Sequence, residues 1–206
     1  DPCTLLPVYT RLSDAEEHER IKFAKQDAEA NAVEAKDLES GVQGGSVIRY
    51  QPLEAAWVPA VAAMESQVMG TDAWSEAQVL DELPRPDRTW WAAFEVADTR
   101  KRTVNVGEAK LVGYAGGWIN DGQVQLLKVA SDPAYRRQGI AQELLARIAL
   151  DARDLGAKDM TLEVRASNMG AHAFYERLGL KEIGIRPRYY SDGENACIYE
   201  GPLPLS

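Results

Sequence analysis

The chain has 206 residues, and 45% of them are hydrophobic, which is enough for one domain of ordinary size with a full core. Its formal net charge is -9 at pH 7. This charge disfavours nucleic-acid binding as the main role, because neutralising a phosphate backbone requires a basic face. An acidic surface would instead attract cationic partners, such as the tail of a basic protein.

The chain contains two cysteines, Cys3 and Cys197, which lie far apart without the spacing of metal ligands. We therefore expect no disulfide framework and no bound metal, and a reducing cytoplasm is the simplest location. No apolar stretch is long enough to cross a membrane, so we expect no membrane association. The start of the chain does not resemble a signal peptide.

Residues 1–45 differ in composition from the rest of the chain. Ser13 followed by Glu16 is a capping-box pattern, and residues 14–40 are rich in Ala, Glu, Lys and Asp. Their apolar residues form only a thin stripe, which favours a charged helical or partly disordered extension. A helix that docks on a partner or on the domain is the alternative. The compact domain is expected at residues 46–206.

The pattern of the compact domain predicts elements in the order β α α β β β α β α β β. Strands are expected at residues 47–50, 90–96, 111–118, 123–130, 160–166, 180–185 and 195–199. Helices are expected at residues 53–69, from 75 to 84, from 140 to about 155, and 168–178. Asn120-Asp121-Gly122 is a strong hairpin turn signal between two of the strands. The order predicts a mixed sheet with helices on its faces, of the α/β or α+β class.

Residues 129–148 change their hydrophobic period in the middle. A short continuous apolar run precedes Asp132, as in a buried strand, and helical spacing follows Gly139, with Ile140, Leu144, Leu145 and Ile148. Arg136 and Arg137 therefore lie on a loop that enters a helix. The unpaired N–H groups of a helix N-terminus suit a phosphate or pyrophosphate. An ordinary turn with surface arginines explains the same pattern equally well.

Glu163 lies at the centre of a predicted strand. The alternation puts Met160, Leu162, Val164 and Ala166 on one face and Thr161, Glu163 and Arg165 on the other. A carboxylate in this position must be paired, solvated or used in chemistry. The residues leave two interpretations open: a structural ion pair with an arginine such as Arg165 or Arg188, or a general base that faces a cleft.

The remaining polar candidates have simple structural explanations. The spacing favours Tyr175 as a core residue, although a phenol at a cleft could also donate a proton to a leaving group. Asn168 directly precedes a helix and is expected to be its N-cap. His18 and His172 have no metal partner at helical or loop spacing, so we expect both at the surface. Cys197 is expected to pack as a small apolar residue. No residue stands in a nucleophile elbow, which leaves a covalent intermediate without support.

Several motifs then agree with one family. Residues 136–141, Arg-Arg-Gln-Gly-Ile-Ala, resemble the Q/R-x-x-G-x-G/A signature of the GNAT acetyltransferase superfamily, which binds the pyrophosphate of acetyl-CoA at a helix N-terminus. Further segments resemble the RimI-type ribosomal-protein-alanine N-acetyltransferases. These segments are residues 74–76, 162–168, 174–180, 185–190 and 192–196. The resemblance covers about residues 47–203, and its motifs occur in the family's order.

The resemblance implies a GNAT fold, with a mostly antiparallel mixed sheet and two parallel strands that splay apart at the acetyl-CoA site. It implies that Glu163 is the general base and that Tyr175 is the general acid on the CoA thiolate. The residues implied to contact acetyl-CoA are Val129, Ala130, Ser131, Arg136, Arg137, Gln138, Gly139, Ile140, Ala141, Gln142, Asn168 and Tyr175. We further expect Tyr189 and Tyr190 to line the acceptor channel and Trp74 to close it.

The implied function is direct acetyl transfer to the N-terminal α-amine of a protein. RimI-type enzymes suggest a basic small-subunit ribosomal protein with N-terminal alanine as the partner, and acetyl-CoA as the co-substrate. Acetylation of lysine side chains or of a small-molecule amine is the enzymatic alternative. An acyl-CoA sensor or scaffold is the non-enzymatic one, against which the presence of both Glu163 and Tyr175 argues. Lys128 departs from the family, because related sequences often carry a smaller polar residue there.

Overall fold

The computed structural model describes residues 46–97 and 104–205. The chain divides into two units, Asp1–Gly45 and Ser46–Ser206. The charged extension expected at residues 1–45 lies outside the described residues, as do Cys3 and His18. The interpretation of that segment therefore stays a prediction.

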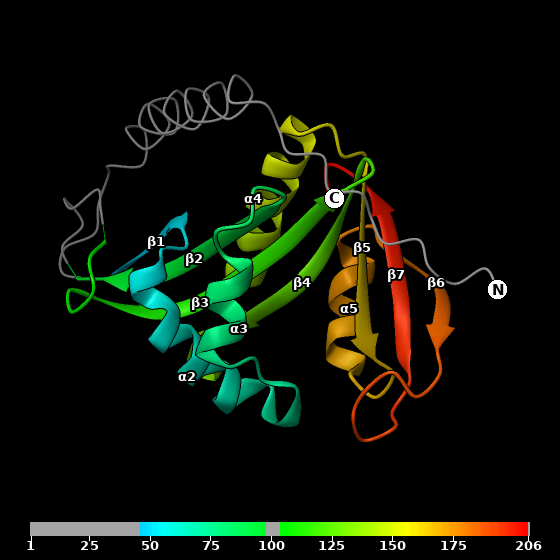
Figure 1. The fold of residues 1–206 in the computed structure, drawn as a ribbon, viewed down its shortest axis with the longest axis horizontal. Helices are drawn as coiled ribbons and strands as arrows, with labels where there is room; N and C mark the ends of the chain where they lie inside the picture. The colour runs from blue at the N-terminus through cyan, green and yellow to red at the C-terminus, as the bar shows by residue number, and fades with distance from the viewer. Residues whose placement is uncertain (1–45, 98–103, 206) are drawn as a thin grey trace. The chain divides into compact units, whose positions relative to one another are not determined.

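A sheet of seven strands, in the order β1-β2-β3-β4-β5-β7-β6, forms the centre of the described domain (Figure 1). The strands are β1 (Val47–Pro52), β2 (Arg88–Val96), β3 (Ala109–Asn120), β4 (Gln123–Ser131), β5 (Asp159–Arg165), β6 (Lys181–Arg186) and β7 (Ala196–Pro202). All neighbouring strands pair antiparallel except β4 and β5, which are parallel. The structure thus confirms the mixed, mostly antiparallel sheet.

Helices cover both faces of this sheet, as the sequence predicted (Figure 1). They are α2 (Val58–Val68), α3 (Glu76–Glu82), α4 (Ile140–Asp154) and α5 (Met169–Arg177). Short 3-10 turns precede or join them: η1 (Ala55–Trp57), η2 (Gly70–Asp72) and η3 (Pro133–Tyr135). The expected capping residue of α3 is confirmed, because the Ser75 side chain accepts a hydrogen bond from the Gln78 N–H in a capping box.

The sheet separates two hydrophobic clusters, because successive strand residues point to opposite faces. Trp90 and Phe94 of β2 belong to the cluster under α2 and α3, whereas Ala93 belongs to the cluster under α4 and α5. The α4 side chains buried in the second cluster include Ile140, Leu144, Leu145 and Ile148, which confirms the predicted helical spacing. At Gly117, a Cβ atom would lie 3.0 Å from the Ile148 side chain, so the glycine permits close packing of α4 on β3.

The two parallel strands separate soon after they pair. Gln123–Gln125 of β4 pair with Asp159–Thr161 of β5, and the ladder between these strands then stops. Each strand continues beside its antiparallel neighbour, β4 as far as Ser131 and β5 as far as Arg165. One edge of β4 therefore has no ladder partner on the β5 side beyond residue 125, and Figure 1 shows the two strands diverging. This is the splay that the family resemblance implied.

A tight hairpin joins β3 and β4 directly before the segment in which β4 pairs with β5. Asp121 and Gly122 both have positive φ, 47° and 77°, and Asn120 pairs directly with Gln123. This is the two-residue turn that the sequence predicted.

No helix within residues 46–97 or 104–205 is long and apolar enough to cross a membrane.

Candidate functional site

The loop between β4 and α4 leaves the start of a long helix open. Gly139 is the N-cap residue and lies in the left-handed region with φ 81°, and Arg137 has φ 64°. Among the residues that the structure describes, no side-chain hydrogen bond caps α4. A Cβ atom on Gly139 would meet nothing within 4 Å, so the space beside its backbone is free. The free N–H groups of the first helical turn can therefore approach an anion closely.

The surroundings of this helix start suit a phosphorylated ligand. A cavity of about 390 Å³ adjoins it, lined by Tyr50, Gln138, Gly139, Gln142, Glu143 and Ala146. Arg136 and Arg137 are exposed on the same loop. Ile140 is one of the residues implied to contact acetyl-CoA, but its side chain is buried in the core, so only its backbone can contact a ligand. The loop residues and the unpaired edge of β4 along Val129–Ser131 could hold the pyrophosphate and the extended arm of acetyl-CoA, which stays a prediction.

Glu163 faces the side of the sheet that carries α2 and α3, opposite the buried residues of β5. Its side chain is 9% exposed, and Oε1 lies 3.3 Å from a guanidinium nitrogen of Arg186. Gln125 Nε2 donates to Oε2 at 3.2 Å. The expected partner was wrong: Arg165 turns to other carboxylates, and the backbone of Arg188 is held by Asn195 in the β6–β7 loop.

The ion pair of Glu163 leaves the carboxylate usable. Arg186 is 54% exposed, so solvent screens the interaction and the pair contributes little stability. Another cation, such as an acceptor amine, can compete for the same oxygen. The structure thus shows an ion pair between Glu163 and an arginine, and the role of Glu163 as a general base stays a prediction.

Tyr175 lies in α5 on the opposite side of β5 and is buried in the core. Its ring packs against Phe174 at 5.3 Å and Tyr199 at 6.1 Å between centroids, which confirms the packing role. No hydrogen bond joins its hydroxyl to another residue that the structure describes. Burial, and then the neighbouring Tyr190, raise the pKa of Tyr175. The phenol therefore stays protonated at neutral pH.

Of the other two polar residues at α5, the prediction for Asn168 is confirmed and the prediction for His172 is wrong. Asn168 caps α5, with its amide oxygen accepting from the Ala171 N–H at 3.1 Å. His172 is buried rather than exposed, because it faces β7. Its Nδ1 lies 2.8 Å from the Tyr199 hydroxyl, and its Nε2 lies 3.1 Å from the Arg165 carbonyl oxygen.

The sequence analysis considered only metal partners at helical or loop spacing from this histidine, and the fold brings two potential ligands from other elements close to it. Donor atoms of His172, Glu182 and Cys197 lie within 4.8 Å of one another. They come from α5, β6 and β7, so their approach depends on strand order and no local spacing could reveal it. Cys197 itself is buried, as predicted.

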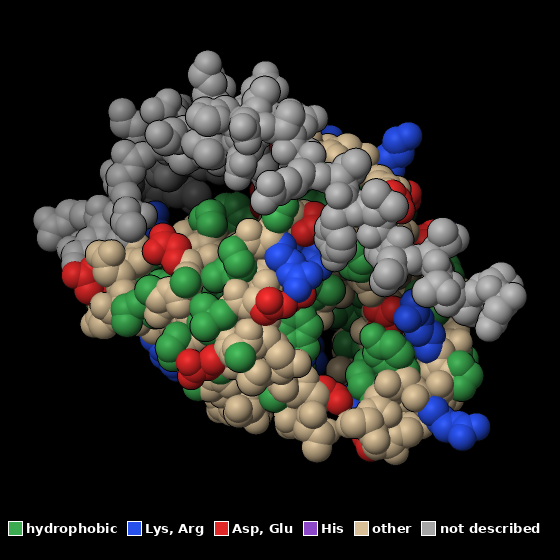
Figure 2. Space-filling model, viewed as in Figure 1, with side chains coloured by type: hydrophobic (Ala, Val, Ile, Leu, Met, Phe, Trp, Pro, Cys, Tyr) green, Lys and Arg blue, Asp and Glu red, His purple; other side chains and the backbone are tan. Residues whose placement is uncertain are grey.

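The aromatic residues expected at the acceptor channel lie on the same face as Glu163. Tyr189 and Tyr190 stack edge to face, with ring centroids 5.1 Å apart. Burial, and next the nearby charge of Glu163, raise the pKa of Tyr189, which is consistent with its position beside the carboxylate. Trp74 precedes α3, and its ring lies 5.0 Å from Lys128 Nζ. Figure 2 shows this face hollowed between the part formed by α2 and α3 and the part formed by β5 to β7.

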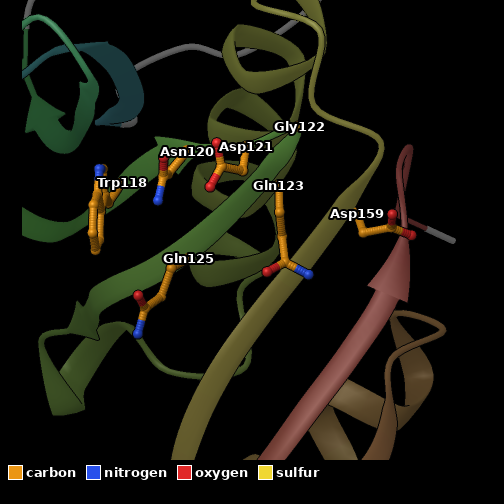
Figure 3. A pocket seen from close by; sticks show the side chains of 7 residues that line it. All are labelled: Trp118, Asn120, Asp121, Gly122, Gln123, Gln125 and Asp159. Atoms are coloured by element: carbon orange, nitrogen blue, oxygen red, sulfur yellow. The ribbon is translucent and has the colours of Figure 1, made fainter. Parts of the chain in front are cut away.

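Gln125 also connects Glu163 to a second cavity. This cavity has a volume of about 330 Å³ and lies at the paired end of β4 and β5 (Figure 3). Its lining residues are Trp118, Asn120, Asp121, Gly122, Gln123, Gln125 and Asp159. Sequence reasoning missed Gln125 and Arg186 as neighbours of Glu163. The alternation along β4 could have placed Gln125 on this face, but only the strand pairing brings it to Glu163.

Comparison with known proteins agrees with this geometry. The family described as "Acetyltransferase (GNAT) family" matches residues 64–180. The [ribosomal protein bS18]-alanine N-acetyltransferase of Escherichia coli (strain K12) is 37% identical over 99 residues, which are 47% of this chain and 67% of that protein. A Bacillus subtilis relative is 36% identical over 92 residues, 44% of this chain, and the chain spans only 61% of its length.

A solved structure extends the likeness over most of the chain. The crystal structure of the ribosomal-protein-S18-alanine N-acetyltransferase from Escherichia coli has a TM-score of 0.63 and 28% sequence identity. The comparison covers 78% of this chain and 96% of that chain. The helix start, the diverging strands and the family match lead to one conclusion: the chain belongs to the GNAT acetyltransferase family.

Proposed function

We propose that this protein is an acetyl-CoA-dependent N-acetyltransferase that modifies the N-terminal α-amine of a basic protein. The observation that carries the proposal is the arrangement at the splay, where Glu163 faces one side of β5 and Tyr175 lies on the other. Relatives named as ribosomal-protein-alanine N-acetyltransferases support a small-subunit ribosomal protein with N-terminal alanine as the acceptor.

The residues of the α4 loop would hold the co-substrate. When bound, acetyl-CoA supplies an activated thioester. The backbone N–H groups from Gly139 to Gln142 and the guanidinium groups of Arg136 and Arg137 would bind its pyrophosphate. The unpaired backbone edge at Val129–Ser131 would bind the extended arm. Asn168 uses its amide oxygen as a cap, which leaves its NH₂ group for the ligand.

The two candidate catalytic residues then have separate tasks. An α-amine has a reference pKa of about 8, so it is mostly protonated at neutral pH and must lose a proton before it attacks. Glu163 would accept this proton, directly or through a water, while Gln125 and Arg186 orient the carboxylate. Tyr175 would give its hydroxyl proton to the departing CoA thiolate. Binding both reactants in one site adds the advantage of proximity.

A panel of acceptors tests this proposal. Peptides with a free N-terminal alanine and basic residues after it, internal-lysine peptides and polyamines are each incubated with acetyl-CoA. Thiol release gives the rate, and mass spectrometry locates the acetyl group. We expect acetylation of the α-amine of the N-terminal peptides, helped by Asp121 and Asp159 at the cavity beside Gln125. Turnover of only lysine peptides or polyamines would support the alternative acceptors, and binding without turnover would support a sensor.

Replacing Tyr175 by Phe tests the general acid. We expect kcat to fall by about tenfold to a hundredfold, because one proton transfer loses its donor. Stability should change little, since no hydrogen bond from this hydroxyl reaches another described residue. Tyr199→Phe is the matched control, because it removes a hydroxyl of the same cluster that does bond to His172. Equal kcat values for Tyr175→Phe and the wild type would leave the phenol with a packing role alone.

Removing residues 1–45 tests the division of the chain. We expect kcat and KM for a peptide acceptor within about twofold of the full chain, because every candidate site residue follows Ser46. Circular dichroism and thermal melting of both proteins accompany the kinetics. A loss of folded structure in the shortened protein would show that the extension belongs to the domain.

A further inference from the structure

A network of charged side chains on the acceptor face takes no part in the chemistry described above. Its centre is Glu65 of α2, which is fully buried. The Glu65 carboxylate accepts hydrogen bonds from the Tyr114 hydroxyl, from the Trp74 N–H at 2.8 Å and from Lys128 Nζ at 3.1 Å. Lys128 is itself only 11% exposed. Both ions have lost most of their water, and this cost offsets much of their attraction, so the pair adds little to the stability of the fold. Its presence therefore needs another explanation.

Asp72 connects this network across the splay. It accepts from Lys128 Nζ of β4 through its backbone carbonyl at 2.8 Å. It accepts from Arg165 Nε of β5 through its carboxylate, also at 2.8 Å. Lys128 and Arg165 both lie beyond the paired segment of the two strands, where β4 and β5 have diverged. One residue of η2 therefore joins the two strands across the gap between them.

Arg165 continues the connection to the β6–β7 loop. A second guanidinium nitrogen contacts Glu194 at 2.5 Å and Asp192 at 2.9 Å. The guanidinium carbon lies 4.0 Å from the centre of the Tyr190 ring. The side chain of Arg165 is 22% exposed, so these contacts are partly shielded from solvent. The loop that carries the channel tyrosines is thus fixed to the turn that precedes Trp74.

The contacts that join Lys128, Asp72 and Arg165 lie close to Glu163. Arg165 follows Glu163 by two residues on the same strand, so both side chains leave the same face of β5. The network also holds more carboxylates than cations, with Glu65, Asp72, Asp192 and Glu194 around Lys128 and Arg165. An excess of negative charge beside the base favours a cationic acceptor, such as a protonated N-terminus.

We propose that the Lys128–Asp72–Arg165 bridge closes the acceptor side of the splay and positions the acceptor amine at Glu163. The bridge holds the two walls of the channel, the η2 turn and the β6–β7 loop, at a fixed separation. An acceptor then binds to a preformed channel and need not order two loops. The inference rests on the proposed function, and it assigns Arg165 and Asp72 as positioning residues that determine acceptor affinity.

Arg165→Gln and Asp72→Asn, alone and combined, test the bridge. We expect Arg165→Gln to raise the acceptor KM by roughly tenfold and Asp72→Asn by less, because Arg165 also binds the loop acids. The double variant should match Arg165→Gln alone, since both changes break the same contact. For all three, kcat should stay within about threefold and the Kd of acetyl-CoA, measured by calorimetry, should not change. Arg165→Lys should recover part of the KM.

Arg85→Gln is the control, because Arg85 also forms two ion pairs, with Asp81 and Glu82, but at the end of α3. It should leave the acceptor KM unchanged. An unchanged KM in Arg165→Gln, or effects of the two substitutions that multiply in the double variant, would overturn the bridge. The comparison uses the acceptor that the wild type acetylates. If the wild type acetylates only a polyamine, the proposed function is wrong about the acceptor. The KM values of the variants for the polyamine still test the bridge.

Discussion

Glu163→Gln is expected to lower kcat by about a hundredfold or more while the Kd of acetyl-CoA stays the same. An amide keeps the shape of the side chain and its hydrogen bond with Gln125, but it cannot take the proton of the acceptor amine. Steady-state kinetics with a peptide acceptor give kcat, and calorimetry gives the Kd. The deficit should narrow above about pH 8, where the acceptor amine loses its proton without help.

Glu200→Gln is a close control for this substitution. Glu200 lies on the neighbouring strand β7 and accepts from the Gln123 amide at 3.1 Å, just as Glu163 accepts from Gln125. Its loss should leave kcat nearly unchanged. Near-normal turnover of Glu163→Gln at neutral pH would remove Glu163 as the base and assign it to the ion pair with Arg186.

Gly139→Val is expected to weaken acetyl-CoA binding by tenfold or more. The N-cap has φ 81°, which a β-branched residue adopts only with strain, so the loop must change its path. The added side chain would also occupy the free space beside the helix start. Both effects move the backbone N–H groups away from the pyrophosphate. Calorimetry with acetyl-CoA measures the change directly.

Gly156→Val separates this effect from general strain. Gly156 follows the other end of α4, with φ 87° and nothing within 4 Å of an added Cβ atom. Both variants should lose stability by a similar amount, but only the change at Gly139 should affect the Kd. If both proteins bind acetyl-CoA like the wild type, the α4 loop is not the pyrophosphate site.

The sequence predicted those features that depend on neighbours along the chain. Alternation along β5 placed Glu163 on the correct face, helical spacing identified the buried side of α4, and Asp121-Gly122 gave the hairpin. Element boundaries differed by a few residues, as expected where helices and strands fray. The mixed sheet and its helices on both faces were also correct.

The sequence could not predict contacts that depend on strand order. Arg186 reaches Glu163 from β6, two strands away, and took the place of the expected Arg165 or Arg188. His172 was misplaced at the surface because its partner Tyr199 lies on β7. Local patterns show which way a side chain points, and only the pairing of strands decides what it meets.

The short ladder between β4 and β5 has a consequence for the mechanics of the domain. It is the single junction in the sheet between β1–β4, which come first in the chain, and β5–β7, which follow. Opening there would break few backbone hydrogen bonds and leave two antiparallel halves paired, with α2, α3 and α4 on the first and α5 on the second. A molecule that spans the junction would act as a brace between the halves. Some of the resistance of this protein to heat should then come from its co-substrate and rise with the concentration of that molecule.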